Sequence, residues 1–150
     1  MPALKSGQSM IEVLVAIAMA AVVLVALAGM GTKSTSNSGM SSRQSQATAY
    51  AQKAMNIFKS LRQAGWDQIK TYSGNYCFNG TTVSAGSWCS IPNTEYSSLV
   101  VVNKPGAVAL TPEPINVTVK VRWYEGKGGD AAVCGVGYFC SVLTNTFIRY

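Results

Sequence analysis

The feature that most constrains this chain is an apolar run close to its N-terminus. From Val13 to Met30, eighteen consecutive residues are apolar or glycine. A helix of that length covers roughly 27 Å, close to the ~30 Å hydrocarbon core of a bilayer. The run therefore predicts a membrane-spanning helix. One carboxylate, Glu12, lies at its start, where a charge costs on the order of 3 kcal/mol at membrane depth and less near the interface.

The order of the N-terminal features distinguishes two interpretations of this segment. A secretory signal has a positive n-region, an apolar core of about 7–15 residues and a small-residue cleavage site after that core. Here the apolar run is longer, and the small residues Ser6 and Gly7 precede it. A plain signal anchor, with Glu12 close to the headgroups, is the simpler alternative.

The stretch from Lys5 to Met30 resembles the prepilin signal of type IV pilins and type II secretion pseudopilins. In that family a short basic leader ends in Gly, a dedicated peptidase cuts after it, and the fifth mature residue is Glu. Gly7, Gln8 and Glu12 match this spacing, since Glu12 is the fifth residue counted from Gln8. The family usually has Phe or Met as the first mature residue, so Gln8 leaves methylation of the new amine open.

The resemblance implies a leader at residues 1–7, a transmembrane and filament-core helix at 8–31 and a head domain at 43–150. It implies a structural subunit, a minor pilin or pseudopilin, of a type IV pilus or related secretion pseudopilus. Such a subunit enters the bacterial inner membrane as a single-pass precursor with its head outside the cytoplasm. Its partners are other pilin or pseudopilin subunits, the prepilin peptidase and the inner-membrane assembly platform. In the filament, Glu12 is expected to neutralise the N-terminal amine of a neighbouring subunit.

Residues 32–42 are rich in Ser and Gly, which predicts a linker or a loosened, partly helical joint. From Arg43 the helical pattern returns, because apolar residues recur at helical spacing until Gly65, a plausible helix stop (Tyr50, Ala54, Ile57, Phe58 and Leu61). This stripe predicts an amphipathic helix that packs on a sheet. Thr71 to Asn93 is irregular and predicts a long loop with a turn at Asn79-Gly80.

Three segments further along predict strands. Residues 96–103 form a short apolar run, and residues 115–124 alternate apolar and polar side chains, which is typical of a strand with one buried face. Residues 141–149 predict a returning strand. A long N-terminal helix, part transmembrane and part amphipathic, on a small antiparallel sheet gives an α+β, pilin-like fold class.

The four cysteines, Cys77, Cys89, Cys134 and Cys140, contain no C-x-x-C pair, and an even number in an exported chain predicts disulfides. Three connectivities are open on sequence alone. We expect sequence-local pairing, Cys77 with Cys89 and Cys134 with Cys140, because each pair lies in its own loop-like segment.

Residue types argue against an enzyme. The chain has no His, which excludes Ser-His-Asp and Cys-His catalysis and His-ligated zinc. The carboxylates outside the apolar run are isolated; Glu125 and Asp130 bracket a Gly-rich stretch in which turn chemistry is a better interpretation than calcium binding. We therefore expect no catalytic, cofactor or metal site.

A nucleic-acid partner is the alternative of a different class. Lys plus Arg number 12 against 6 Asp plus Glu, and the positive residues are spread out without a basic run. Such a bias is compatible with DNA contact by a competence filament and is more typical of ordinary solubility. A further alternative is a signal-anchored periplasmic domain that never assembles.

Overall fold

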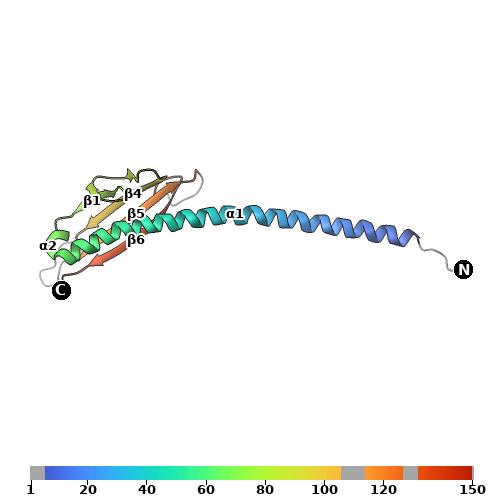
Figure 1. Cartoon of the computed structure of the whole chain (residues 1–150), viewed down its shortest axis with the longest axis horizontal. Coiled ribbons are helices and arrows are strands. Elements are labelled where there is room, and N and C mark those ends of the chain that lie inside the picture. Colours follow the sequence, from blue (N-terminus) through green and yellow to red (C-terminus); the bar gives the residue numbers. More distant parts are fainter. Residues whose placement is uncertain (1–5, 106–113, 127–131, 150) are drawn as a thin grey trace. The chain divides into compact units, whose positions relative to one another are not determined.

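The computed structural model describes residues 6–105, 114–126 and 132–149, with the backbone alone for residues 6–9 and 29–36 (Figure 1). The chain divides into two compact units, Met1–Ser42 and Arg43–Tyr150. The first helix, α1 (Ser6–Ala64), contributes residues to both units.

Residues 32–42 are helical as part of α1, which agrees with the helical alternative predicted for this stretch and not with a linker. Gly lowers helix stability by about 1 kcal/mol relative to Ala, and Ser by less. Extending an existing helix, however, adds one hydrogen bond per residue without the cost of a new nucleus. Helical sequence on both sides therefore carries the helix through this weak stretch.

The second unit combines the C-terminal part of α1 with one antiparallel sheet, as the α+β prediction required (Figure 1). The short helix α2 (Trp66–Ile69) follows α1. The strands are β1 (Gly74–Phe78), β2 (Val83–Ala85), β3 (Cys89–Ser90), β4 (Tyr96–Asn103), β5 (Ile115–Tyr124) and β6 (Tyr138–Phe147). The strand order is β2-β1-β4-β5-β6, with β3 paired to β4, and every pair is antiparallel.

The three predicted strands are confirmed, and they are neighbours in the sheet. β4 and β5 have the expected bounds, whereas β6 begins at Tyr138 instead of Ser141 and ends at Phe147 instead of Arg149. Alternation decides their inward faces: every second residue of β5, from Ile115 to Trp123, is buried. Long strands with a clear period of two are therefore the part of the sheet that sequence predicts well.

The core lies between one stripe of α1 and the inner face of the sheet. Three alanines of the helix are completely buried, and their small side chains let the helix approach the strands closely. Larger side chains fill the space beside them (Met55 and Phe58 from α1; Tyr96, Val100 and Val102 from β4; Val117, Val119, Val121 and Trp123 from β5). The predicted amphipathic stripe thus packs on the sheet, with Tyr50, Ile57 and Leu61 at its half-buried border.

Two glycines are required by local geometry. Gly65, where the sequence predicts the helix stop, follows the last residue of α1 and has φ +149°, a conformation that other residues rarely adopt. Gly137, just before β6, has φ +79°, and a Cβ atom there would lie 2.9 Å from Cε2 of Tyr124. Gly65 therefore ends α1, and Gly137 leaves room for the Tyr124 ring beside the start of β6.

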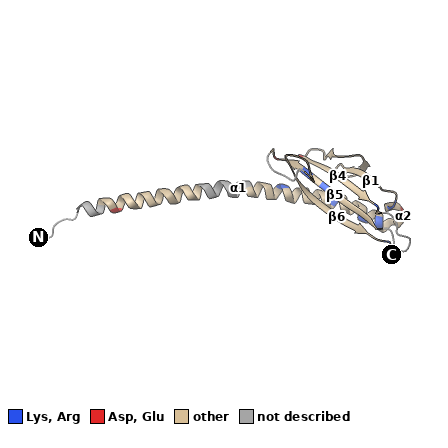
Figure 2. Cartoon of the chain, turned by 180° about the vertical axis from the view of Figure 1, so that it is seen from behind, with Lys and Arg blue, Asp and Glu red and all other residues tan. Residues whose placement is uncertain are grey.

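The described charged side chains are concentrated in the second unit. Glu12 and Lys33 are the charged residues of α1 before Arg43, and the side chain of Lys33 lies outside the described ones. Lysine and arginine residues recur over the sheet and the later turns of the helix (Figure 2). The excess of positive charge in the chain is therefore spread over the head surface.

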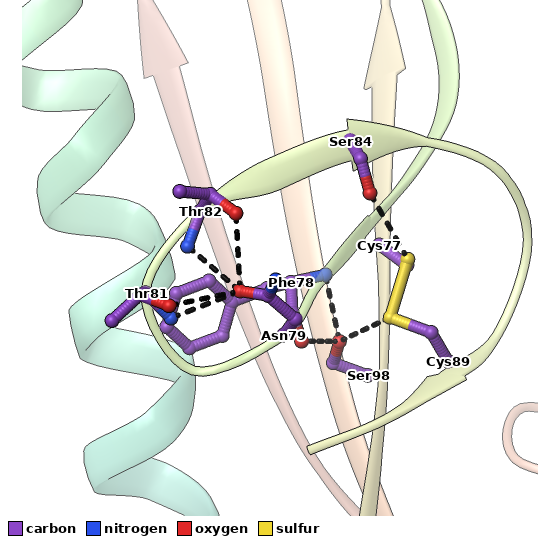
Figure 3. Close-up of a disulfide and its surroundings, with 8 residues drawn as sticks. All are labelled: Cys77, Phe78, Asn79, Thr81, Thr82, Ser84, Cys89 and Ser98. Carbon is purple, nitrogen blue, oxygen red and sulfur yellow. Dashed lines mark hydrogen bonds between the residues drawn. A yellow bond between two sulfur atoms is a disulfide. The ribbon is translucent and has the colours of Figure 1, made fainter. Parts of the chain in front are cut away.

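The segment from Thr71 to Asn93, expected to be an irregular loop, contains three short strands instead. The Asn79-Gly80 turn is confirmed: it connects β1 to β2, and the Asn79 side-chain oxygen accepts hydrogen bonds from the backbone amides of Thr81 and Thr82 at 3.1 and 2.8 Å (Figure 3). A disulfide between Cys77 and Cys89 joins β1 to β3. The Asn79 side chain therefore stabilises the turn of the β1–β2 hairpin, and the disulfide links β1 to β3.

Ser98 is the one buried polar side chain among the described residues, and it is fully satisfied. Its hydroxyl donates to the Phe78 carbonyl at 2.6 Å and accepts from the Phe78 amide at 2.9 Å (Figure 3). Here the end of β1 has left the regular β1–β4 ladder, whose register stops at Tyr76. The hydroxyl thus supplies the hydrogen bonds that a neighbouring strand would otherwise provide.

We expect Ser98→Ala to lower the free energy of unfolding by roughly 1–3 kcal/mol, because it leaves both polar groups of Phe78 buried without a partner. The measurement is denaturant unfolding of the full chain in detergent micelles, followed by tryptophan fluorescence. Ser97→Ala is the matched control, since Ser97 is a half-buried neighbour on the other face of β4. Equal losses in the two variants would contradict this role for Ser98.

Candidate functional site

The candidate functional segment is the N-terminal part of α1. Met10–Ala28 is the one helix segment among the described residues that is long and apolar enough to cross a membrane, with 19 residues and a mean hydropathy of 2.8. At 1.5 Å per residue its length approaches the ~30 Å bilayer core. The structure therefore supports single-pass membrane anchoring by length and composition.

Apolar side chains surround this segment of the helix. Large apolar side chains on all sides remain exposed, from 48% for Val15 to 74% for Val25. A helix packed on its own domain shows an apolar stripe and a polar side, whereas one that is apolar all round is surrounded by lipid or by other helices. Each buried side chain of this size gains about 1.5–3 kcal/mol relative to water. An apolar surface of this extent is compatible with a membrane-spanning helix.

Glu12 lies in the first turns of this apolar segment and is exposed. It is the sole acidic residue before Asp67 in the sequence. No described cation lies within ion-pair distance of it, so its charge has no counter-charge inside the described chain. A carboxylate in this position is favourable near water or beside a positive group from elsewhere.

Gly7 and Gln8, the predicted processing residues, lie in the first turn of α1, where the backbone alone is described. Residues 8 and 12 are four apart in the helix, so they share one face and are separated by about 6 Å along the axis. Cleavage after Gly7 would place a new amine one helical turn from the carboxylate.

The four cysteines are paired as expected, Cys77 with Cys89 and Cys134 with Cys140, and the described residues include no free thiol.

The second bridge lies beside Arg122 on the outer face of the sheet. The Arg122 guanidinium is 3.8 Å from the Trp88 ring centroid and 4.3 Å from that of Tyr138, and its Nη1 donates to the Cys134 carbonyl at 3.1 Å. Stacking and hydrogen bonding of this kind hold the loop of the second disulfide against β5.

We expect alkylation without prior reduction to leave all four cysteines unmodified in the mature protein. Cys89→Ser should lower the free energy of unfolding by about 3 kcal/mol, because the bridge closes a loop with a sequence separation of 12. Cys140→Ser is the comparison, and its loss should be slightly smaller because its separation is 6. Peptide mapping that links Cys77 to Cys140, or detects two reactive thiols, would contradict the pairing.

A polar cluster at the start of the second unit has no local signal in the sequence. Arg43 forms ion pairs with Glu95 at 3.1 Å and Glu125 at 3.0 Å, and the indole of Trp123 donates to the same Glu125 oxygen at 3.0 Å. The hydroxyl of Tyr96 donates to the Arg43 carbonyl at 3.2 Å. These residues are far apart in the sequence, so no local motif predicts the cluster.

Electrostatics in this cluster follow from its geometry. The hydrogen bond that Arg43 donates to Glu125, and then the negative charge of Glu95, raise the pKa of Arg43. Burial, and then the nearby Glu95 charge, raise the pKa of the Tyr96 phenol above its usual value. The cluster connects α1 at Arg43 to the start of β4 and the end of β5. Its residues therefore have a structural role.

The described residues include no group of three or more potential metal ligands. The Glu125 side chain, considered above as a calcium ligand, is occupied by Arg43 and Trp123. Asp130, its proposed companion, lies outside the described residues. Comparisons with family models, with curated proteins and with solved structures found no match to this chain.

Proposed function

We propose that this chain is a structural subunit of a type IV pilus or a related secretion pseudopilus, a minor pilin or pseudopilin. One observation carries the proposal: the apolar part of α1 is exposed on every side and contains one unpaired carboxylate. Lipid satisfies the apolar surface of a single subunit, and neighbouring helices satisfy it in a filament. In this proposal the Glu12 carboxylate favours assembly, because it meets a positive group only when a neighbouring subunit is in place.

The proposed precursor is inserted in the inner membrane and cleaved after Gly7 by a prepilin peptidase. The amine of Gln8 of one mature subunit then lies beside Glu12 of a neighbour that is displaced along the filament axis. Two opposite charges satisfy each other in an apolar environment, in which either charge alone is strongly disfavoured. Small side chains along the helix, such as Ala18 beside Val15 and Val22, support close approach of the helices.

Processing is tested by mass spectrometry of the protein from its native host. We expect Gln8 as the N-terminus, with or without one methyl group. Gly7→Glu should leave the uncleaved precursor in the membrane, because the peptidase site requires a small residue. Gly39→Glu is the control, since Gly39 lies further along α1 with open space around its Cα. Intact Met1 in the membrane form of the wild type would favour the signal-anchored domain instead.

Assembly is tested by Glu12→Gln, which keeps the size of the side chain and removes its charge. Insertion and cleavage should survive, whereas incorporation into sheared filaments should fall by at least roughly a hundredfold, because losing one partner of a buried pair costs ~3–5 kcal/mol. Asp67→Asn is the matched control: it removes a carboxylate that is highly exposed and paired to Lys70 on the head surface. Processed Glu12→Gln subunit at wild-type level in filaments would refute the assembly role.

A further inference from the structure

The antiparallel register brings the ends of several elements together at one end of the head. β4 ends, β5 begins and β6 ends here, because Asn103 pairs with Asn116 and Asn116 with Thr146. The last turn of α1 lies at the same end, because the Arg62 guanidinium donates to the Ile148 carbonyl at 3.1 Å. Figure 1 shows α2 here as well. We call this part of the second unit the α2 end of the head.

The α2 end gathers cations from four separate segments. Lys59 and Arg62 lie three residues apart on α1, so they share one face of the helix. Lys70 follows α2, Lys104 follows β4 and Arg149 lies two residues after β6. Figure 2 shows lysine and arginine residues on several elements near α2. These residues form no basic run in the sequence, so the fold alone brings them together.

One carboxylate, Asp67, accompanies these five cations among the described residues. It pairs with Lys70 at 2.8 Å on the exposed surface, where water and salt screen the pair. The hydrogen bond and charge of Lys70, and then the charge of Arg149, lower the pKa of Asp67, so both cations lie near it. Five cations minus one carboxylate leave an excess of four positive charges at the α2 end, whereas the rest of the described second unit has four cations and two carboxylates.

Neutral groups hold two of these cations in place. The Arg62 guanidinium, bonded to the backbone carbonyl named above, lies 5.4 Å from the ring centroid of Trp66. The Lys104 ammonium donates to the Lys70 carbonyl. Such contacts orient the charged groups without cancelling their charge, whereas Arg43 at the other end of the head pairs with two carboxylates. The α2 end is thus suited to a partner with several negative groups.

We propose that the α2 end binds the phosphate backbone of duplex DNA. A duplex carries one negative charge per about 1.7 Å of its axis, and lysine and arginine side chains that neutralise its phosphates release condensed counterions. Contacts of this kind position a protein on the duplex without reading its sequence. The proposal rests on the proposed function for its setting, because a head outside the cytoplasm meets DNA from outside the cell.

The composition of the α2 end favours DNA over an anionic membrane surface. Surfaces that bind membranes combine cations with exposed apolar side chains that enter the headgroup region. Among the described residues of the α2 end, Ile148 is the one large apolar side chain that is exposed. The net charge of +6 also attracts a polyanion to the chain as a whole. A hydrophilic, basic surface of this kind is typical of contact with nucleic-acid phosphates.

The experiment measures binding of the full chain, in nonionic detergent micelles, to a fluorescently labelled DNA duplex by fluorescence anisotropy. The titration is repeated over a range of salt concentrations, from roughly 50 to 200 mM. In the wild type, the logarithm of the affinity should fall linearly with the logarithm of the salt concentration. Because up to five cations contact phosphates, the slope should be roughly −3 to −5.

The test variant combines Lys59→Gln with Arg149→Gln, two exposed cations of the α2 end. Its affinity at ~0.1 M salt should fall by roughly tenfold to a hundredfold, and the salt slope should shrink by about 2, because two phosphate contacts are lost. The matched control combines Lys53→Gln with Lys120→Gln, which removes two charges of the head away from the α2 end. The control has the same net charge as the test variant and should bind within about threefold of the wild type, since net charge alone acts only at long range.

Three results would overturn the proposal. Absence of binding would exclude DNA as the partner, and equal losses in the two double variants would show attraction by net charge alone. Tighter binding of polygalacturonate than of the duplex at equal charge concentration would assign the α2 end to an acidic polysaccharide. An unfolding midpoint equal to that of the wild type verifies that each variant head is intact. The Glu12→Gln chain should bind DNA like the wild type, so failure of DNA binding and failure of assembly are distinguishable.

Discussion

The contact between the alanine stripe of α1 and the valine face of β4 and β5 is the interaction on which the rest of the head depends. Ala47, Ala51 and Ala54 are completely buried, so the helix axis can lie close to the sheet. The ring of Trp123 packs near Tyr96 and Phe139 on the same side, and its indole N–H reaches Glu125. The polar cluster around Arg43 can form because this close packing brings the start of the helix to the strand ends.

Sequence predicted the parts of the fold in which pattern and length agree. The ten alternating residues of β5 and the helix that ends before Gly65 were predicted because each pattern is long enough to distinguish the strand period of two from the helix period of 3.6. β1, β2 and β3 were not predicted, since they have five, three and two residues and depend on strand pairing, β1 and β3 with β4 and β2 with β1. For residues 32–42 the sequence left a linker and a helical joint open, because local propensity understates the cooperativity of a long helix.

The same distinction applies to the candidate site. Gly7, Gln8 and Glu12 are close in sequence, so their spacing can be recognised directly, as can the sequence-local cysteine pairs. Arg43 and Glu125 are separated by 82 positions, and the stacking of Arg122 on Trp88 joins β5 to a loop that sequence analysis treated as irregular. Such groups meet only after the sheet has formed. A single sequence offers no periodicity that would indicate them.

The short sequence separations of the two disulfides, 12 and 6 residues, also bear on how the head matures. In a chain threaded from its N-terminal end into an oxidising compartment, Cys77 and Cys89 emerge and can react before the thiols of Cys134 and Cys140 arrive. Thiolate exchange would then join the correct partners by order of emergence, with little opportunity for mixed pairs. The disulfide between β1 and β3 would then form before β5 and β6 are exported. These two strands would add to a part of the sheet that is already cross-linked.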